Sequence, residues 1–193
     1  MSSSVLRPAA GAPWQPVLFD MDGTLIDSAP AILGRLRETL TEFGVTPPEE
    51  DALRLFIGPP MHVTLAHFLP AEQVETARTF YRGLSNRDGL SNQSLYPGIA
   101  DALAELSAAG IPLGIASSKS QEEVQRSTEH FGIASYFAGI AGSSPERQDK
   151  ADVITYALAM LEKGSAHAPL MIGDRKWDIE GALKLKEISY IHA

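Results

Sequence analysis

The sequence of 193 residues contains no cysteine, which excludes disulfides, thiolate zinc sites and cysteine nucleophiles together. It also contains no cluster of Lys or Arg residues. The 16 Lys and Arg against 24 Asp and Glu give a net charge of −8. A main role in binding nucleic acid or a membrane is therefore not expected, and an anionic substrate would need local positive charge. No apolar run approaches the ~18 residues that span a bilayer, and no signal-peptide pattern precedes the first strand. We expect a soluble, cytoplasmic protein.

The composition is that of an ordinary globular protein, with 44% hydrophobic and 21% charged residues. A chain of this mass buries about 70% of its unfolded surface, which suffices for a core without disulfides. At roughly 150 residues per domain, the length predicts one domain with room for an inserted lobe. Residues 1–14 are rich in Pro, Gly and Ser and are interpreted as a flexible N-terminal tail.

Short apolar runs alternate with helical patterns through most of the chain. The predicted strands are 17–19, 113–116, 140–141, 170–172 and 188–191, and the predicted helices between and after them are 99–109, 120–132, 151–161 and 179–185. This alternation is typical of βαβ units and predicts an α/β fold with a parallel sheet. Two helix starts carry capping residues, Ser120 with Glu123 and Asp178 before Ile179.

A segment with helical patterns only interrupts this alternation of strands and helices. A helix is predicted from Pro30 to Phe43, with Asp27 and Ser28 as its capping residues. From residue 46 to about 94, helical fragments are separated by Pro and Gly, and no strand is predicted among them. We therefore expect a small all-helical insert after the first strand.

Four polar clusters follow a predicted strand or open a helix, where sites of parallel α/β sheets lie. They are Asp20 with Asp22, Ser117-Ser118-Lys119, Lys150, and Gly173-Asp174 with Asp178. Carboxylate oxygens are the ligands that Mg²⁺ prefers, and Mg²⁺ commonly bridges carboxylates and phosphate oxygens. A carboxylate can also act as a nucleophile and form an aspartyl phosphate.

Hydrolysis of a phosphate monoester suits this set, because the reaction needs positioning and dense stabilisation of charge. Asp20 would attack phosphorus, and Asp22, two residues on, would protonate the leaving oxygen and later deprotonate water. Ser117 would donate to a phosphate oxygen, Lys150 would offset the converging negative charge, and Asp174 would complete the coordination of Mg²⁺.

The segment from Phe19 to Leu25, FDMDGTL, resembles the first motif of the haloacid dehalogenase-like hydrolases. Three further motifs of that family follow in order: IAS ending at Ser117, Lys150, and GDRKWD from Gly173 to Asp178. The IGPP run at 57–60 and the YPGI run at 96–99 are similar to the phosphoglycolate phosphatase or 5′-nucleotidase branch. The resemblance implies a three-layer Rossmann-like core with a parallel sheet and an inserted small all-helical cap.

The same resemblance implies roles for individual residues. The nucleophile and first metal ligand is Asp20, and Asp22 is the general acid and base whose backbone carbonyl also binds metal. Asp174 is a metal ligand, and Asp178 acts on the metal through water. The implied contacts to the substrate phosphate come from Gly23, Thr24, Ser117, Ser118, Lys119 and Lys150.

The resemblance also divides the chain into a core of residues 15–27 and 96–193 and a cap of residues 28–95. We expect the cap to close over a small phosphate ester, with Arg54, Arg82 and Arg87 as candidates for contacting its distal group. We expect a monomer or homodimer.

Three alternatives stay open. A phosphomutase like β-phosphoglucomutase would use the same residues, a phospho-switch would hold its aspartyl phosphate for longer, and a truncated paralogue would bind without catalysis. The third arises because the resemblance implies a glycine turn, a loop and a closing helix beyond Ala182, and residues 183–193 carry none of these patterns. The catalytic candidates all precede that point, so the chemistry is expected to survive if the core folds.

Overall fold

The structure is a computed structural model that describes residues 14–161, 168–185 and 188–192. Its main sheet has five parallel strands in the order β5-β4-β1-β6-β7. The strands are β1 (Trp14–Phe19), β4 (Leu113–Ser120), β5 (Gly139–Ser143), β6 (Ala168–Gly173) and β7 (Ser189–His192). The predicted α/β fold with a parallel sheet is confirmed.

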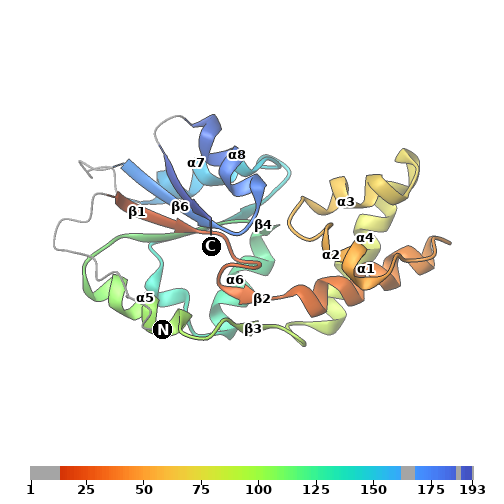
Figure 1. The fold of residues 1–193 in the computed structure, drawn as a ribbon, viewed down its shortest axis with the longest axis horizontal. Coiled ribbons are helices and arrows are strands. Elements are labelled where there is room, and N and C mark those ends of the chain that lie inside the picture. The colour runs from red at the N-terminus through yellow and green to blue at the C-terminus, as the bar shows by residue number, and fades with distance from the viewer. Residues whose placement is uncertain (1–13, 162–167, 186–187, 193) are drawn as a thin grey trace.

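Helices cover both faces of this sheet (Figure 1). The helices α5 (Ile99–Ala108) and α6 (Gln121–His130), with a short 3₁₀ turn η1 (Ala134–Tyr136), lie on one face; α7 (Lys150–Met160) and α8 (Lys176–Lys184) lie on the other. Alternate residues of β1 serve the two layers: Val17 and Phe19 pack with α5 and α6, and Leu18 packs with α7. The result is a three-layer core.

The cap contains four helices that lie beside the sheet, beyond the end toward which the strands run (Figure 1). They are α1 (Ala29–Glu42), α2 (Glu50–Arg54), α3 (Met61–Phe68) and α4 (Ala71–Asp88). These helices bury an apolar cluster of their own, which includes Leu33, Leu36, Leu40, Leu53, Leu65 and Leu69. A helix whose apolar stripe faces neighbouring helices does not need the sheet to bury it.

An antiparallel ribbon connects the cap to the core, and it was not predicted. It pairs β2 (Ile26–Asp27) with β3 (Ser94–Leu95). The expectation of no strand up to residue 94 was wrong at that residue, because a strand of two residues carries no readable periodicity.

The start of α1 also differs from the prediction. Ser28 occupies the N-cap position of α1, but its side chain makes no capping hydrogen bond. Its hydroxyl donates instead to the carboxylate of Asp22. The Asp27 carboxylate accepts from the backbone N–H of Ala29, so only Asp27 acts at the helix start through its side chain.

Two expectations concern the ends of the chain and membranes. Of the predicted tail at 1–14, residues 1–13 lie outside the described residues, and Trp14 begins β1. Within the described ranges, no helix combines the length and apolar character needed to cross a bilayer.

Candidate active site

Asp20 follows the last residue of β1 and lies at the carboxyl end of the sheet. The side chain is buried, and its Oδ1 accepts a hydrogen bond of 2.6 Å from Nζ of Lys150. Burial raises the pKa of Asp20 to about 7, against the opposing effect of the Lys150 ammonium. Whether the Asp20 carboxyl group is ionised therefore depends on cations close to it.

Lys150 opens α7, one residue earlier than the predicted helix, and joins two carboxylates that are far apart in sequence. Its Nζ lies 2.6 Å from Oδ1 of Asp20 and 2.7 Å from Oδ1 of Asp178. Burial alone would lower the pKa of Lys150, yet these two carboxylates raise it above its ordinary value. The ammonium is therefore held charged within the acidic cluster.

Asp178 lies inside α8, which begins at Lys176, so the expected helix start at Ile179 was wrong, but the Asp178 side chain does cap the helix, from its third position. Arg175 takes the N-cap position, and its backbone N–H donates to Oδ2 of Asp178 at 3.0 Å. The other carboxylate oxygen is thereby left to face Lys150.

Asp20, Asp174 and Asp178 each place a carboxylate oxygen within 4.8 Å of the other two. Oδ1 of Asp174 is buried and has no hydrogen-bond partner among the described residues. Such an oxygen is costly unless a cation or water satisfies it. A hard divalent cation such as Mg²⁺ fits this all-oxygen donor set.

Gly23 is required beside this cluster. Its φ of +84° favours glycine, and an added Cβ would lie 2.3 Å from Oδ2 of Asp174. The DG dipeptide of the first motif therefore allows the turn after Asp22 to approach Asp174. In the same way, a Cβ on Gly173 would lie 2.3 Å from Asp178.

Asp22 lies in the turn after β1, and among the described residues its carboxylate pairs with Lys119 rather than with Lys150 and does not belong to the three-carboxylate cluster. Its Oδ1 accepts from the hydroxyl of Ser28 and lies 2.7 Å from Nζ of Lys119. Asp20 and Asp22 therefore have different cationic partners. This separation suits two carboxylates with different roles.

Ser117, Ser118 and Lys119 form the carboxyl-terminal part of β4. Together with Asp20 and Asp22 they line one side of a cavity of about 230 Å³, whose opposite side comes from the cap. Ser117 is almost fully buried. The structure thus brings together Asp20, Asp22, Ser117, Ser118 and Lys119 at one opening.

The remaining predicted phosphate-binding residues, Gly23, Thr24 and Lys150, do not line this cavity. Lys150 lines a neighbouring cavity of about 100 Å³ that Ser118 also borders. Gly23 and Thr24 continue the turn after Asp22, and Oγ1 of Thr24 is buried without a hydrogen-bond partner among the described residues.

Of the three arginines that the sequence suggested for contacting the substrate, one lines the cap side of the 230 Å³ cavity. Arg82 lines the cavity and pairs with Glu75 at 3.8 Å, whereas Arg54, paired with Glu50, and Arg87, paired with Glu38, do not line it. Sequence reasoning missed Arg35, which also lines the cavity. Its signal was available: a charged residue in α1 beside Leu36, on a helix whose apolar spacing marks the buried face.

Comparison with known proteins places this geometry in a family. The model of the haloacid dehalogenase-like hydrolases matches residues 17–190. A tyrosine-protein kinase, PtkA of Mycobacterium tuberculosis, is 41% identical over 170 residues, which are 87% of this chain and 58% of that protein. The chain thus spans less than two thirds of PtkA.

Two further relatives cover more of their own length. A phosphoglycolate phosphatase of Mesorhizobium japonicum is 33% identical, over 86% of this chain and 77% of that protein. The solved structure of a haloacid dehalogenase-like family hydrolase from Streptococcus pneumoniae aligns with a TM-score of 0.85 and 35% identity, covering 93% of this chain and 84% of that one.

Proposed function

The chain belongs to the haloacid dehalogenase-like hydrolases, and from that premise we propose that it is a Mg²⁺-dependent phosphatase of small phosphorylated metabolites. The observation that carries the proposal is the contact of buried Asp20 with Lys150 at the edge of a cavity lined by both core and cap. The phosphoglycolate phosphatase relative supports a small phosphate ester as the substrate.

In the proposed first step, an Oδ atom of Asp20 attacks phosphorus, and the bond from phosphorus to the leaving oxygen breaks. Asp22 gives its proton to that oxygen, so an alcohol leaves and an aspartyl phosphate remains. Asp22 then takes a proton from water, whose oxygen attacks the same phosphorus. Inorganic phosphate departs and the carboxylate of Asp20 is restored.

The other residues stabilise charge during these steps. Ser117 donates to a phosphoryl oxygen, and the Lys150 ammonium, 2.6 Å from Asp20, offsets the negative charge that gathers there. Asp20 and Asp174 would hold Mg²⁺ directly and Asp178 would act on it through water, with the backbone carbonyl of Asp22 as a further ligand. When bound, the cation supplies positive charge to the phosphoryl oxygens.

We assign residues 28–95 to a substrate-selecting cap and residues 15–27 and 96–193 to the catalytic core. The separate apolar cluster of the cap supports this division, because a unit with its own core can move as a body. Closure of the cap would exclude water from the phosphoryl group and contact the leaving group.

A panel assay tests the proposal. Phosphoglycolate, nucleoside monophosphates, sugar phosphates and p-nitrophenyl phosphate are incubated with the protein, with and without Mg²⁺, and phosphate release is measured. We expect Mg²⁺-dependent release that Asp20→Asn abolishes. Isomerisation of a sugar phosphate without net phosphate release would favour the phosphomutase alternative instead.

A second candidate function follows from the 41% identity to PtkA, which is named a tyrosine-protein kinase. Phosphoryl transfer from ATP to a tyrosine hydroxyl would give phosphotyrosine, whereas a phosphatase gives inorganic phosphate. Incubation with radiolabelled ATP and a tyrosine-containing polypeptide separates the two. Label on tyrosine that requires Asp20 would favour the kinase activity.

A further inference from the structure

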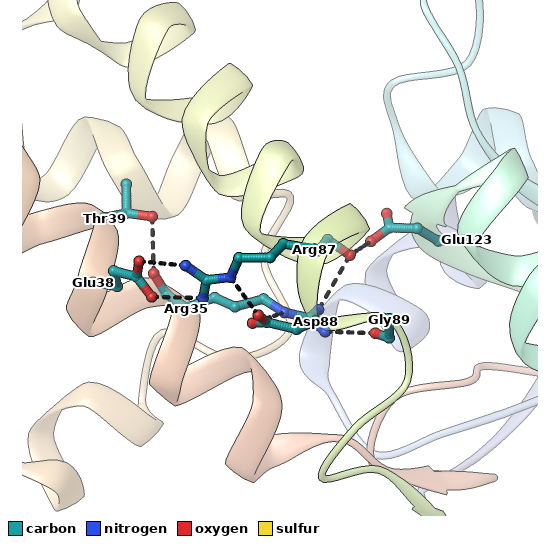
Figure 2. Close-up of polar contacts among 8 residues, drawn as sticks. Arg35, Glu38, Thr39, Arg87, Asp88, Gly89 and Glu123 are labelled. Atoms are coloured by element: carbon teal, nitrogen blue, oxygen red, sulfur yellow. Dashed lines mark hydrogen bonds and ion pairs between the residues drawn. The ribbon is translucent and has the colours of Figure 1, made fainter.

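A polar contact joins the cap to the core beside the cavity. Ser85, a buried residue of α4, donates a hydrogen bond of 2.5 Å from its hydroxyl to Oε1 of Glu123 in α6. Figure 2 shows Glu123 extending from the core helix toward the cap helices that carry Arg35 and Asp88. The two bonded residues are 38 positions apart, so the contact forms only when α4 lies against α6.

On the cap side, Arg35 fixes the hydroxyl of Ser85. Its Nη1 donates to Oγ of Ser85 at 3.2 Å, and its Nη2 donates to the carbonyl oxygen of Gly89 at 2.8 Å. Its Nε also lies 3.5 Å from the carboxylate of Asp88. Because Oγ accepts from Arg35, its own proton is directed to Glu123.

On the core side, Glu123 belongs to the first turn of α6. Its Oε2 accepts from the hydroxyl of Ser120 at 2.8 Å, and its backbone N–H donates to the same hydroxyl. Burial alone would raise the pKa of Glu123, but Lys119 and the hydroxyls of Ser85 and Ser120 hold it below its ordinary value. Glu123 is therefore an ionised group whose two oxygens are both occupied.

Lys119 links this arrangement to the candidate acid and base. Its ammonium lies 2.7 Å from Oδ1 of Asp22 and makes no direct ion pair with Glu123, but its positive charge lowers the pKa of Glu123. Lys119 thus serves two carboxylates, one satisfied by the cap and one proposed to transfer protons. If the cap departs, Oε1 of Glu123 loses its donor and attracts the ammonium away from Asp22.

We propose that Glu123 is a positioning residue that couples the seating of the cap, through Ser85, to the placement of Lys119 and Asp22. The inference rests on the acid and base role proposed for Asp22. With the cap seated, Lys119 and Ser28 together hold the Asp22 carboxyl group in one orientation beside the leaving group. With the cap displaced, Asp22 keeps Ser28 but loses part of its contact with Lys119.

The first test compares kcat/KM for two substrates, because this ratio reports phosphoryl transfer to Asp20 rather than later release of phosphate. Loss of p-nitrophenolate needs no proton from Asp22, whereas loss of the alkoxide from phosphoglycolate does. We expect Ser85→Ala and Glu123→Gln to lower kcat/KM for phosphoglycolate about tenfold more than for p-nitrophenyl phosphate.

Glu122→Gln is the matched control, because Glu122 is an exposed carboxylate in the same helical turn. We expect this variant to leave kcat/KM unchanged for both phosphoglycolate and p-nitrophenyl phosphate. Equal losses for the two substrates in Ser85→Ala and Glu123→Gln would overturn the proposal, since a merely structural role lowers both rates alike. Unchanged rates for both substrates would overturn it as well.

A second test measures cap seating without turnover, so it stands even if the proposed phosphatase activity fails. Because the sequence has no cysteine, Glu72→Cys and Glu105→Cys place two spin labels at exposed sites of cap and core. We expect Ser85→Ala to add a population with a longer distance between the labels. A distribution identical to that of the doubly labelled parent would contradict the role of Ser85.

Discussion

The strand-end cluster and the cap hold their charges in different ways. Lys150 and its partners Asp20 and Asp178 are at most 10% exposed at their side chains, and the ion pairs are 2.6 and 2.7 Å long. In the cap, the pairs Arg54–Glu50 and Arg87–Glu38 join side chains that are about half exposed. Loss of one partner of a buried ion pair strongly destabilises the folded protein, whereas an exposed ion pair contributes little to its stability.

This difference indicates a division of labour. The core fixes a set of charges whose geometry the proposed chemistry requires, and the cap places Arg35 and Arg82, each paired with a carboxylate, in the cavity wall. Substitutions in the cluster should therefore change turnover or stability by large factors. Substitutions on the cap side of the cavity should change mainly the affinity for substrate.

The largest expected effect is on turnover in Asp20→Asn. The amide cannot act as the nucleophile, so kcat should fall by at least about a thousandfold. Steady-state phosphate release measures this loss, and circular dichroism checks the fold. Retention of near-parental turnover would show that the nucleophile lies elsewhere.

The next effect is the loss of stability expected for Lys150→Met. This change leaves the carboxylates of Asp20 and Asp178 buried together without their cation, and we expect the free energy of unfolding to fall by about 3 kcal/mol. Urea denaturation without Mg²⁺ provides the measurement. In a double-mutant cycle, Asp20→Asn should relieve part of the loss; strict additivity would mean that the two side chains are not coupled.

The pH dependence of stability should be of similar size, and its direction is distinctive. Burial raises the pKa of Asp20 from 3.8 to about 7, so between these values the native state keeps a proton that the unfolded state has released. The contribution of Asp20 to the free energy of unfolding is therefore fully present below about pH 4 and is lost as the pH rises toward 7. Metal-free protein should lose roughly 10 °C in Tm across this window.

Asp20→Asn is the control for this titration, because the amide has no proton to lose there. Its Tm should vary less between pH 4 and 7 than that of the parent protein, as followed by differential scanning calorimetry. Parallel profiles for the two proteins would rule out Asp20 as the source of the slope.

The smallest expected effect concerns the cap. Arg82→Gln removes a cation from the cavity wall, so KM for an anionic substrate such as phosphoglycolate should rise about fivefold with kcat nearly unchanged. Arg87→Gln is the matched control, because Arg87 belongs to the same helix and also pairs with a glutamate but does not line the cavity. Equal KM values in the two variants would remove the distinction between cavity and surface arginines.

The sequence made the central sheet predictable because its strands are apolar runs at regular spacing. The runs 17–19, 113–116 and 170–172 all lie within observed strands of the sheet. Asp20, Lys150 and Asp174 could be nominated because their chemistry and order resemble the family motifs. Their grouping near one sheet edge follows from parallel strands, whose carboxyl ends meet there.

Contacts made across the cap were not predictable in this way. Ser85 and Glu123 meet because two separately packed units lie against each other, and neither residue carries a local pattern that names its partner. Ser28 had a standard helix-start position, yet its hydroxyl binds Asp22 because that carboxylate lies within reach in the folded chain. Such contacts depend on tertiary placement rather than on periodicity.

The most direct test of the account is to locate the phosphoryl group during turnover. The protein is quenched with saturating substrate and Mg²⁺ and reduced with borohydride, which converts an aspartyl phosphate to homoserine; peptides are then sequenced by mass spectrometry. We expect homoserine at position 20 in the parent protein and none in Asp20→Asn. Homoserine at another aspartate, or active turnover with none detectable at position 20, would contradict the account.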